Sequence, residues 1–137
     1  MSTDKKILTY SSVSRKLASH RKRKQKIVFV TGCFDIMHLG HVIFLNYAKK
    51  QGDTLVVGVG SDKTVKKLKG PKRPILNEKF RSRMLAALAV VDYVIINKEK
   101  LVNFNIDHSK LIKKVKPDVF VVPVTDKKLD YKKRLVE

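Results

Sequence analysis

The sequence predicts an α/β fold built on a doubly wound parallel sheet. Four short runs rich in Val and Ile are apolar along their whole length, as strands buried on both faces are. Segments with the apolar spacing of amphipathic helices separate these runs. The expected strands are Lys26–Val30, Thr54–Val59, Tyr93–Ile96 and Asp118–Val122.

Start and stop signals place the helices between the strands. Gly52 and Pro117 are typical of helix ends, and Asn77 is a strong N-cap residue. The Gly and Pro residues of the segment 69–74 indicate a loop. The expected helices are Ser11–Lys24 with Ser12 or Ser14 as start signal, Leu39–Lys50, a short one from Ser61-Asp62 to Leu68, Asn77–Val90, and Asp107–Val115.

Charge is the unusual part of the composition. The 137 residues include 31 Lys and Arg against 12 Asp and Glu, a formal net charge of +19, which favours polyanionic ligands. The densest run, His20 to Lys26, is either a nucleic-acid patch or a solvated helix end. No aromatic residues are interleaved with these cations, so we expect nucleic-acid binding to be non-specific at most. We divide the chain into a basic N-terminal helical extension, 1–25, and a single main domain, 26–137.

The location is expected to be cytoplasmic. The chain has one cysteine, Cys33, so no intrachain disulfide can form. Its longest apolar stretches are too short to span a bilayer, and no apolar signal segment follows the first charged residues. A membrane partner is therefore not expected.

The stretch FVTGCFDIMHLGHVIFL, residues 29–45, carries the chemistry. His38 and His41 lie three apart at the start of a predicted helix, directly after the first strand. Imidazoles placed there can donate hydrogen bonds to phosphate oxygens and to charge that develops at phosphorus. Gly32 permits a tight turn, and Gly40 leaves room for a phosphate at the helix N-terminus. The pattern is neither a Walker A loop nor HExxH, so a zinc site is not expected.

The same stretch resembles the HxGH signature of the cytidylyltransferase-like nucleotidyltransferases. Three segments resemble, in order, the nucleotidyltransferase domain of ADP-heptose synthases: GCFDIMHLGHVIFLNYAKKQGDTLVVGVGSD, VKKLKGPKRPI and RMLAALAVVDYVI. Glycerol-3-phosphate cytidylyltransferase is the next-best resemblance. The likeness implies a Rossmann-like nucleotidyltransferase fold over 26–137.

This resemblance implies a reaction in which a substrate phosphate attacks the α-phosphate of ATP or CTP and pyrophosphate leaves, without a covalent intermediate. Magnesium would accompany the triphosphate, and homodimers are common in the family. The residues implied as catalytic are His38, His41, Lys69 and Arg83. The nucleotide would be bound by Thr31, Gly32, Cys33, Phe34, Asp35, His38, Gly40, His41, Lys66, Lys67, Arg83 and Asp92.

Several of these residues have a second interpretation. Lys66, Lys67 and Lys69 are expected in a mobile, glycine-containing loop that could fold over the phosphates, or they are plain surface lysines. Arg83 could be a solvated helix residue. Asp35 shapes the loop by accepting backbone N–H bonds, lies near the acceptor, or is a plain turn residue. Asp92 lies near the nucleotide or is a helix-to-strand turn residue. Cys33 is expected to be a small buried apolar residue rather than a nucleophile.

The chain also departs from the family pattern. It lacks the Ser/Thr-rich "ISTT" signature of a later helix and ends in LDYKKRLVE, which is typical of a helix start. Asp130–Lys132 resembles a shifted remnant of the Lys-Gly-Gly-Asp-Tyr turn of the heptose enzymes. Ala89 replaces an arginine of the glycerol-phosphate enzymes, which disfavours that substrate.

The first expectation is therefore an adenylyltransferase for a sugar phosphate resembling heptose 1-phosphate. The alternatives are a glycerol-3-phosphate cytidylyltransferase, an FMN adenylyltransferase, a non-catalytic nucleotide-binding relative and a nucleic-acid-binding module. The base and the acceptor depend on scattered loop residues, so the sequence leaves both open.

Overall fold

The computed structural model describes residues 3–103 and 105–123. Its strands are β1 (Ile7–Leu8), β2 (Ile27–Gly32), β3 (Thr54–Gly60), β4 (Tyr93–Asn97), β5 (Leu101–Val102), β6 (Asn105–Ile106) and β7 (Val119–Phe120). Its helices are a 3-10 turn η1 (Thr3–Lys6), α1 (Tyr10–Lys22), α2 (Leu39–Lys49), α3 (Asp62–Lys69), α4 (Glu78–Ala86) and α5 (Ser109–Val115).

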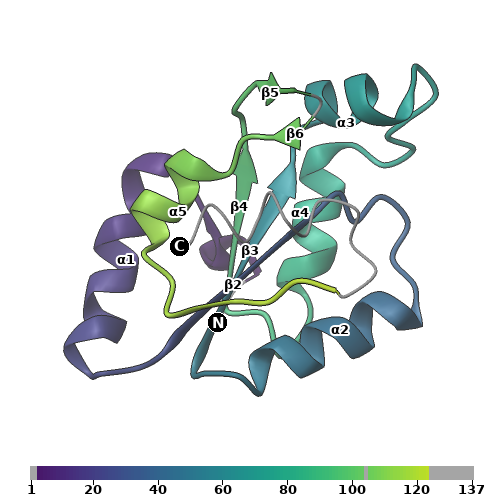
Figure 1. Cartoon of the computed structure of the whole chain (residues 1–137). Coiled ribbons are helices and arrows are strands. Elements are labelled where there is room, and N and C mark those ends of the chain that lie inside the picture. The colour runs from purple at the N-terminus through teal and green to yellow at the C-terminus, as the bar shows by residue number, and fades with distance from the viewer. Residues whose placement is uncertain (1–2, 104, 124–137) are drawn as a thin grey trace.

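Five strands form one parallel sheet in the order β1-β4-β3-β2-β7, which confirms the predicted doubly wound α/β fold (Figure 1). The order reverses at β2, because β3 and β4 extend the sheet on one side and β7 returns to the other. Ligands of doubly wound sheets bind at such a switch point, outside the carboxyl ends of the strands. The topology therefore directs the site to the ends of β2 and β7.

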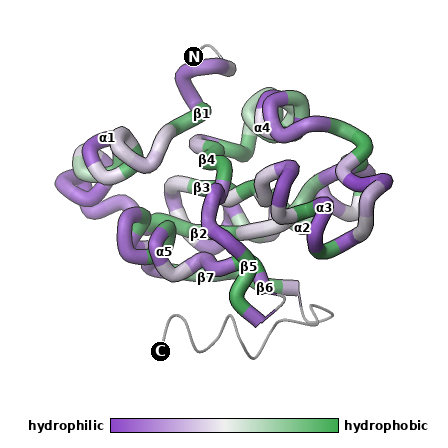
Figure 2. The backbone as a smooth tube through the Cα atoms, turned by 90° about the horizontal axis from the view of Figure 1, so that it is seen from above, coloured by the Kyte–Doolittle hydropathy of each residue, from purple (hydrophilic) through white to green (hydrophobic). Residues whose placement is uncertain are grey.

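Helices cover both faces of the sheet. The α1 and α5 helices lie on one face, and α2 and α4 lie on the other (Figure 2). Alternate residues of β2 enter the two cores: Val28 and Val30 pack with Leu45 of α2, whereas Ile27 and Phe29 pack on the α1 side. Burial on both faces explains why this strand is continuously apolar.

The N-terminal residues belong to the same sheet. β1 pairs with β4 as an edge strand, and Val13 and Leu17 of α1 are fully buried against the sheet. The sequence prediction contained neither β1 nor the β5–β6 hairpin. These three strands are only two residues long, too short to show a periodic pattern.

Most predicted elements are confirmed with shifted ends. Ser61 and Asn77 cap α3 and α4 through their side-chain oxygens, as expected. The α1 helix begins earlier than predicted because Thr9, not Ser12 or Ser14, is its N-cap residue. The α4 helix ends at Ala86, short of Val90, because the chain turns there to enter β4.

Two further points concern membrane crossing and the C-terminal segment. No helix in the described ranges combines the length and the apolar character that crossing a bilayer requires. The predicted helix start in LDYKKRLVE and the turn remnant at Asp130–Lys132 lie outside the described residues.

Candidate active site

A cavity of about 700 Å³ lies at the switch point of the sheet. It is bounded by the end of β2, the loop that follows it, the first turn of α2, and Pro123 after β7. Nine predicted site residues line it: Thr31, Gly32, Cys33, Phe34, Asp35, His38, Gly40, His41 and Lys69. Ile36, Phe44, Arg73 and Pro123 complete the lining.

The two histidines form the cap of α2. His38 is the N-cap residue, and its Nδ1 accepts a hydrogen bond from the Gly40 N–H at 3.0 Å. The backbone N–H of His38 donates in turn to Nδ1 of His41 at 3.2 Å. The imidazole rings lie with their centroids 4.0 Å apart. The first turn thus uses both imidazoles as a reciprocal capping box.

This cap fixes where each neutral imidazole carries its proton. Because both Nδ1 atoms accept a backbone N–H, the proton of each neutral ring is on Nε2. Neither Nε2 has a hydrogen-bond partner among residues 3–103 and 105–123. Burial, His38 and the charge of Lys69 together lower the pKa of His41, which favours its neutral form. The cavity therefore has two Nε2 donors held by the helix cap, and His41 is the one whose neutral form is favoured.

The structure shows why positions 32 and 40 of the motif are glycines, and the reason differs from the one expected. A Cβ on Gly40 would lie 2.8 Å from Cε1 of His38, so the missing side chain makes room for the imidazole rather than directly for a phosphate. A Cβ on Gly32 would lie 2.7 Å from Cε2 of Phe34. Phe34 has a left-handed backbone, φ +50°, and its ring also contacts His41. Both glycines therefore position the aromatic rings of the motif.

Asp35 connects the basic loop, residues 70–76, to the segment that follows β2. Its carboxylate is 4% exposed and accepts from the N–H groups of Ile75 and Leu76 at 2.9 Å and from Nε of Arg73 at 2.5 Å. Burial alone would raise the pKa of Asp35, but these donors outweigh it and lower the pKa to about 2. Of its predicted roles, the loop-shaping one is therefore observed.

Lys69, the last residue of α3, and Arg73 of the basic loop both line the cavity, and the sequence reasoning missed Arg73. Arg73 uses its Nε for Asp35, and its terminal nitrogens have no partner among the described residues. Lys66 and Lys67 do not line this cavity, because the segment that holds the three predicted lysines is helix α3, which points them in different directions. Lys66 instead lines a neighbouring cavity.

Arg81 is a second residue that the sequence reasoning missed. Its guanidinium is fully buried and donates to the carbonyls of Cys33, Gly60 and Leu76 and to Oδ1 of Asp62. It therefore joins the ends of β2 and β3 to the start of α3 and to the basic loop. Its position four residues before Leu85, on the buried face of α4, is the sequence signal that could have identified it.

Arg83 and Asp92 are not brought to the cavity. Arg83 lies on the opposite, exposed side of α4 and pairs with Asp4 at 2.9 Å. Asp92 precedes β4, at the amino end of the sheet, where it accepts from Lys49 Nζ and from the Leu55 N–H. This corrects the expected position of both residues and matches the second interpretation that each was given.

Thr31 has a polar group without a protein partner. Its side chain is 8% exposed, and among the described residues its Oγ1 is buried without a hydrogen-bond partner. Buried hydroxyls are normally satisfied, and this one belongs to a residue that lines the cavity. A ligand with a donor or acceptor at this depth would complete it. Cys33 also lines the cavity and is half-buried.

The acidic residues do not form a metal site of their own. No group of three or more His, Cys, Asp and Glu side chains in the described ranges is placed to hold a metal ion. Asp35, the one carboxylate among the residues that line the cavity, is occupied by Arg73 and two N–H groups. A magnesium ion at this cavity would therefore take most of its ligands from the triphosphate and from water.

Comparison with known proteins identifies the family of this chain. A family model described as cytidylyltransferase-like matches residues 29–135. The chain is 47% identical over 119 residues to the bifunctional protein HldE of Helicobacter pylori (strain Shi470), covering 87% of this chain and 24% of the relative. It is 40% identical over 118 residues to HldE of Syntrophotalea carbinolica, covering 86% and 23%. The chain thus spans about a quarter of the length of these curated relatives.

A solved structure shares the fold and most of the length. The crystal structure of the lipopolysaccharide core biosynthesis protein from Thermoplasma volcanium GSS1 matches with a TM-score of 0.69 and 34% identity. The match covers 82% of this chain and 87% of that one. With the family match across the HxGH motif, these relationships show that the chain belongs to the cytidylyltransferase-like family of nucleotidyltransferases.

Proposed function

We propose that this domain transfers a nucleoside monophosphate from ATP or CTP to a phosphorylated sugar. The substrates that we favour are ATP as the donor and a heptose 1-phosphate as the acceptor. The observation that carries the proposal is the pair of Nε2 donors that the α2 cap holds at the switch-point cavity. The relationship to HldE proteins favours the heptose phosphate, because the sequence resembles the nucleotidyltransferase domain of ADP-heptose synthases.

The proposed reaction is a single in-line displacement. A phosphate oxygen of the acceptor forms a bond to the α-phosphorus, and the bond from that phosphorus to the bridging oxygen breaks. Pyrophosphate leaves with the electron pair, so no proton has to move to a protein group. Catalysis then depends on positioning and on stabilising negative charge.

The side chains divide this work. His38 and His41 donate from Nε2 to the phosphates and to the charge that develops in the transition state. Lys69 and Arg73 supply the positive charge of the same cavity. Asp35 accepts hydrogen bonds from Arg73 and from two N–H groups of the loop, so Arg73 is oriented before the substrate binds. When bound, magnesium neutralises part of the triphosphate charge.

A pyrophosphate-release assay tests the proposal. ATP and CTP are each offered with heptose 1-phosphate, glycerol 3-phosphate, phosphocholine and FMN. We expect the fastest release with ATP and the heptose phosphate, and release about 10²- to 10³-fold slower in the His41→Ala variant. Triphosphate binding without release for any acceptor would contradict the proposal and indicate a non-catalytic nucleotide-binding relative.

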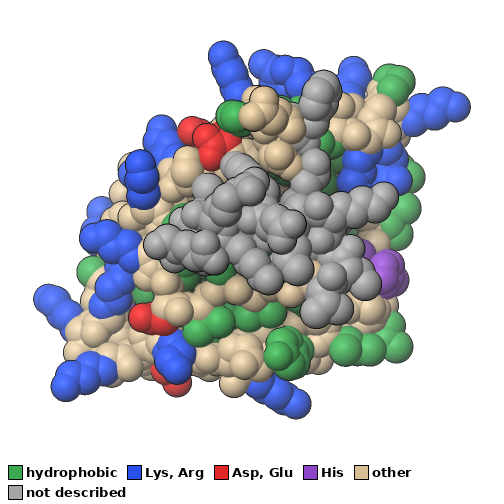
Figure 3. All heavy atoms as spheres, in the orientation of Figure 1, with side chains coloured by type: hydrophobic (Ala, Val, Ile, Leu, Met, Phe, Trp, Pro, Cys, Tyr) green, Lys and Arg blue, Asp and Glu red, His purple; other side chains and the backbone are tan. Residues whose placement is uncertain are grey.

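The wider setting follows from the same reasoning. We propose that the domain acts in the cytoplasm, a reducing compartment that suits a chain with one cysteine. Its partners would be the triphosphate and the acceptor, with a second copy of the chain in a homodimer. The cations of the surface are distributed around the described face rather than gathered over one element (Figure 3). This distribution supports at most non-specific binding of nucleic acid.

A further inference from the structure

A second cavity, of about 520 Å³, lies on the other side of the basic loop. It opens between α3 and the start of α4. Arg73 lines both cavities, so the two share a wall at this side chain. Its lining includes Asp62, Lys63, Lys66, Arg73, Asn77 and Phe80.

The cations of the second cavity suit a phosphate group. Lys63 and Lys66 lie one turn apart on α3, and neither forms an ion pair with an acidic residue in the described ranges. Arg73 is held by Asp35 through Nε only, which leaves its terminal nitrogens available. These three cations, of which Arg73 is held in one orientation by Asp35, can neutralise the charge of a phosphate monoester.

The rest of the cavity suits a polyhydroxylated ring. Oδ1 of Asp62 accepts a hydrogen bond from Arg81, and the second carboxylate oxygen has no partner among the described residues. Asn77 uses its side-chain oxygen to cap α4, which leaves its amide N–H₂ as a donor. The Phe80 ring is 57% exposed and gives an apolar surface for the C–H face of a sugar. A carboxylate, an amide and an aromatic ring beside three cations recognise a sugar and its phosphate together.

We infer that this second cavity binds the phosphorylated sugar acceptor, while the cavity at the HxGH motif binds the triphosphate. The inference rests on the proposed function, which requires two anionic substrates to meet at one phosphorus atom. Arg73 lies between the two cavities and can contact the acceptor phosphate from the triphosphate side. Asp35 therefore positions the residue at which the two substrates approach each other.

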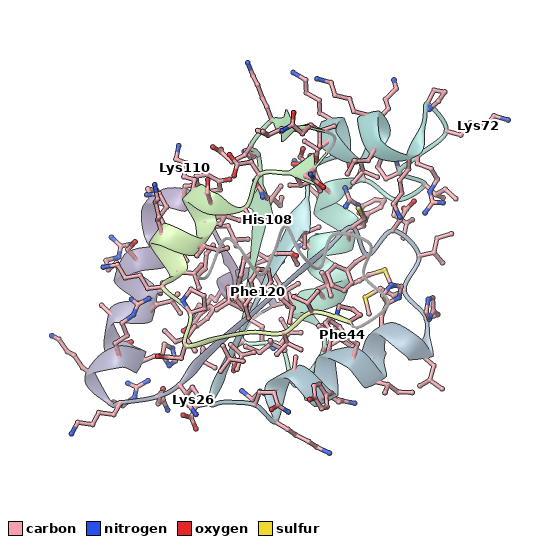
Figure 4. The ribbon with its side chains drawn as sticks, in the orientation of Figure 1. Lys26, Phe44, Lys72, His108, Lys110 and Phe120 are labelled. Atoms are coloured by element: carbon pink, nitrogen blue, oxygen red, sulfur yellow. The ribbon has the colours of Figure 1, made fainter. Side chains whose placement is uncertain are left out.

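The matched variants are Lys63→Ala and Lys72→Ala. Both lysines are exposed, and both substitutions remove one positive charge within ten residues of each other. Lys63 lines the second cavity. Lys72 lies beside Arg73 in the basic loop, lines neither cavity, and extends outward from the loop (Figure 4). Thermal unfolding of both variants checks that the fold is unchanged.

Two readouts separate the substrates. The first is the KM for the sugar phosphate and for ATP in the pyrophosphate-release assay. The second is calorimetric titration with mannose 1-phosphate and, separately, with α,β-methylene-ATP. We expect Lys63→Ala to weaken binding of the sugar phosphate about tenfold, as loss of one charge-assisted hydrogen bond does, and to change nucleotide binding less than twofold. We expect Lys72→Ala to change both less than twofold.

The outcomes distinguish the two ideas. Equal effects of the two lysine variants, or a larger effect of Lys63→Ala on ATP than on the sugar phosphate, would overturn the assignment of the second cavity. Absence of turnover with every acceptor would overturn the proposed function. In that case the calorimetric titration still decides the cavity: mannose 1-phosphate binding that depends on Lys63 supports it, and undetectable or Lys63-independent binding rejects it.

Discussion

Both ends of the parallel sheet are rich in polar groups, but in the described part of the chain they use these groups differently. At the amino end, aspartates close the strands by accepting backbone N–H groups. The pairs are Asp53 with Lys26, Asp118 with Ile27, and Asp92 with Leu55, at 2.7 to 2.8 Å. Asp92 also holds Lys49. This end is satisfied by the protein itself.

At the carboxyl end the protein leaves specific groups open. The Nε2 atoms of His38 and His41, the terminal nitrogens of Arg73 and the buried Oγ1 of Thr31 have no partner in the described part of the chain. Each is nevertheless held in place by a bond made through another atom or by burial. The difference shows that fixed but unpaired polar groups, more than polar groups as such, distinguish a binding site from a structural end.

The largest expected effect comes from Arg81, the buried junction of the carboxyl end. Arg81→Met leaves three carbonyls and Asp62 without their donor, so we expect the free energy of unfolding to fall by about 3–5 kcal/mol. Urea unfolding measures this. Arg83→Met is the control on the same helix, and it should cost less than about 1 kcal/mol because its pair with Asp4 is exposed. Similar losses for the two arginines would contradict this account.

The next effect concerns catalysis without loss of fold. His38→Asn keeps an N-cap residue but removes the Nε2 donor, and His41→Ala removes the second donor. We expect each variant to lose about 10²- to 10³-fold in kcat, as enzymes that lose one charge-stabilising donor do. Steady-state kinetics with thermal unfolding checks both statements. Wild-type rates in His38→Asn would show that the first imidazole serves only as a cap.

The third effect is the pH dependence that Asp35 contributes. Its pKa is about 2 in the fold against 3.8 for the free side chain. Its stabilising contribution is therefore complete above about pH 4 and is lost as the pH falls toward 2, an effect of about 2 kcal/mol. We expect the difference in unfolding free energy between wild type and Asp35→Asn to shrink by this amount between pH 5 and pH 2. A difference that is constant with pH would exclude an ionised, tethered Asp35.

The smallest effect is expected at the amino end. Lys26 and Lys72 lie at opposite ends of the molecule, and the basic run that ends at Lys26 is therefore remote from the cavity (Figure 4). Neutralising Lys22, Arg23 and Lys24 together should change triphosphate affinity by less than a few fold, because salt screens charges over about 8–10 Å. Arg21 is kept, since it donates to the Val115 carbonyl. Nucleotide titration at physiological ionic strength, with duplex DNA in parallel, is the measurement. A loss beyond about tenfold would contradict the separation of the two ends.

The class of fold and the position of the candidate site could be predicted from the sequence alone. Continuous apolar runs with helical segments between them are sufficient for a parallel sheet, and the motif from Gly32 to His41 is local enough for its chemistry to follow from spacing. The shortest elements could not be predicted from the sequence, because two-residue strands such as β1 form only by pairing with distant residues.

Which distant cations lie beside the motif depends on how the helices pack. Lys66, Lys67 and Lys69 are equivalent in sequence, but the phase of α3 sends Lys69 to the first cavity and Lys66 to the second. Arg81 and Arg83 are two residues apart, yet α4 buries one at the junction and exposes the other to Asp4. The reason is that the direction of a side chain depends on which face of a helix packs on the sheet, and that packing involves residues far away in the chain.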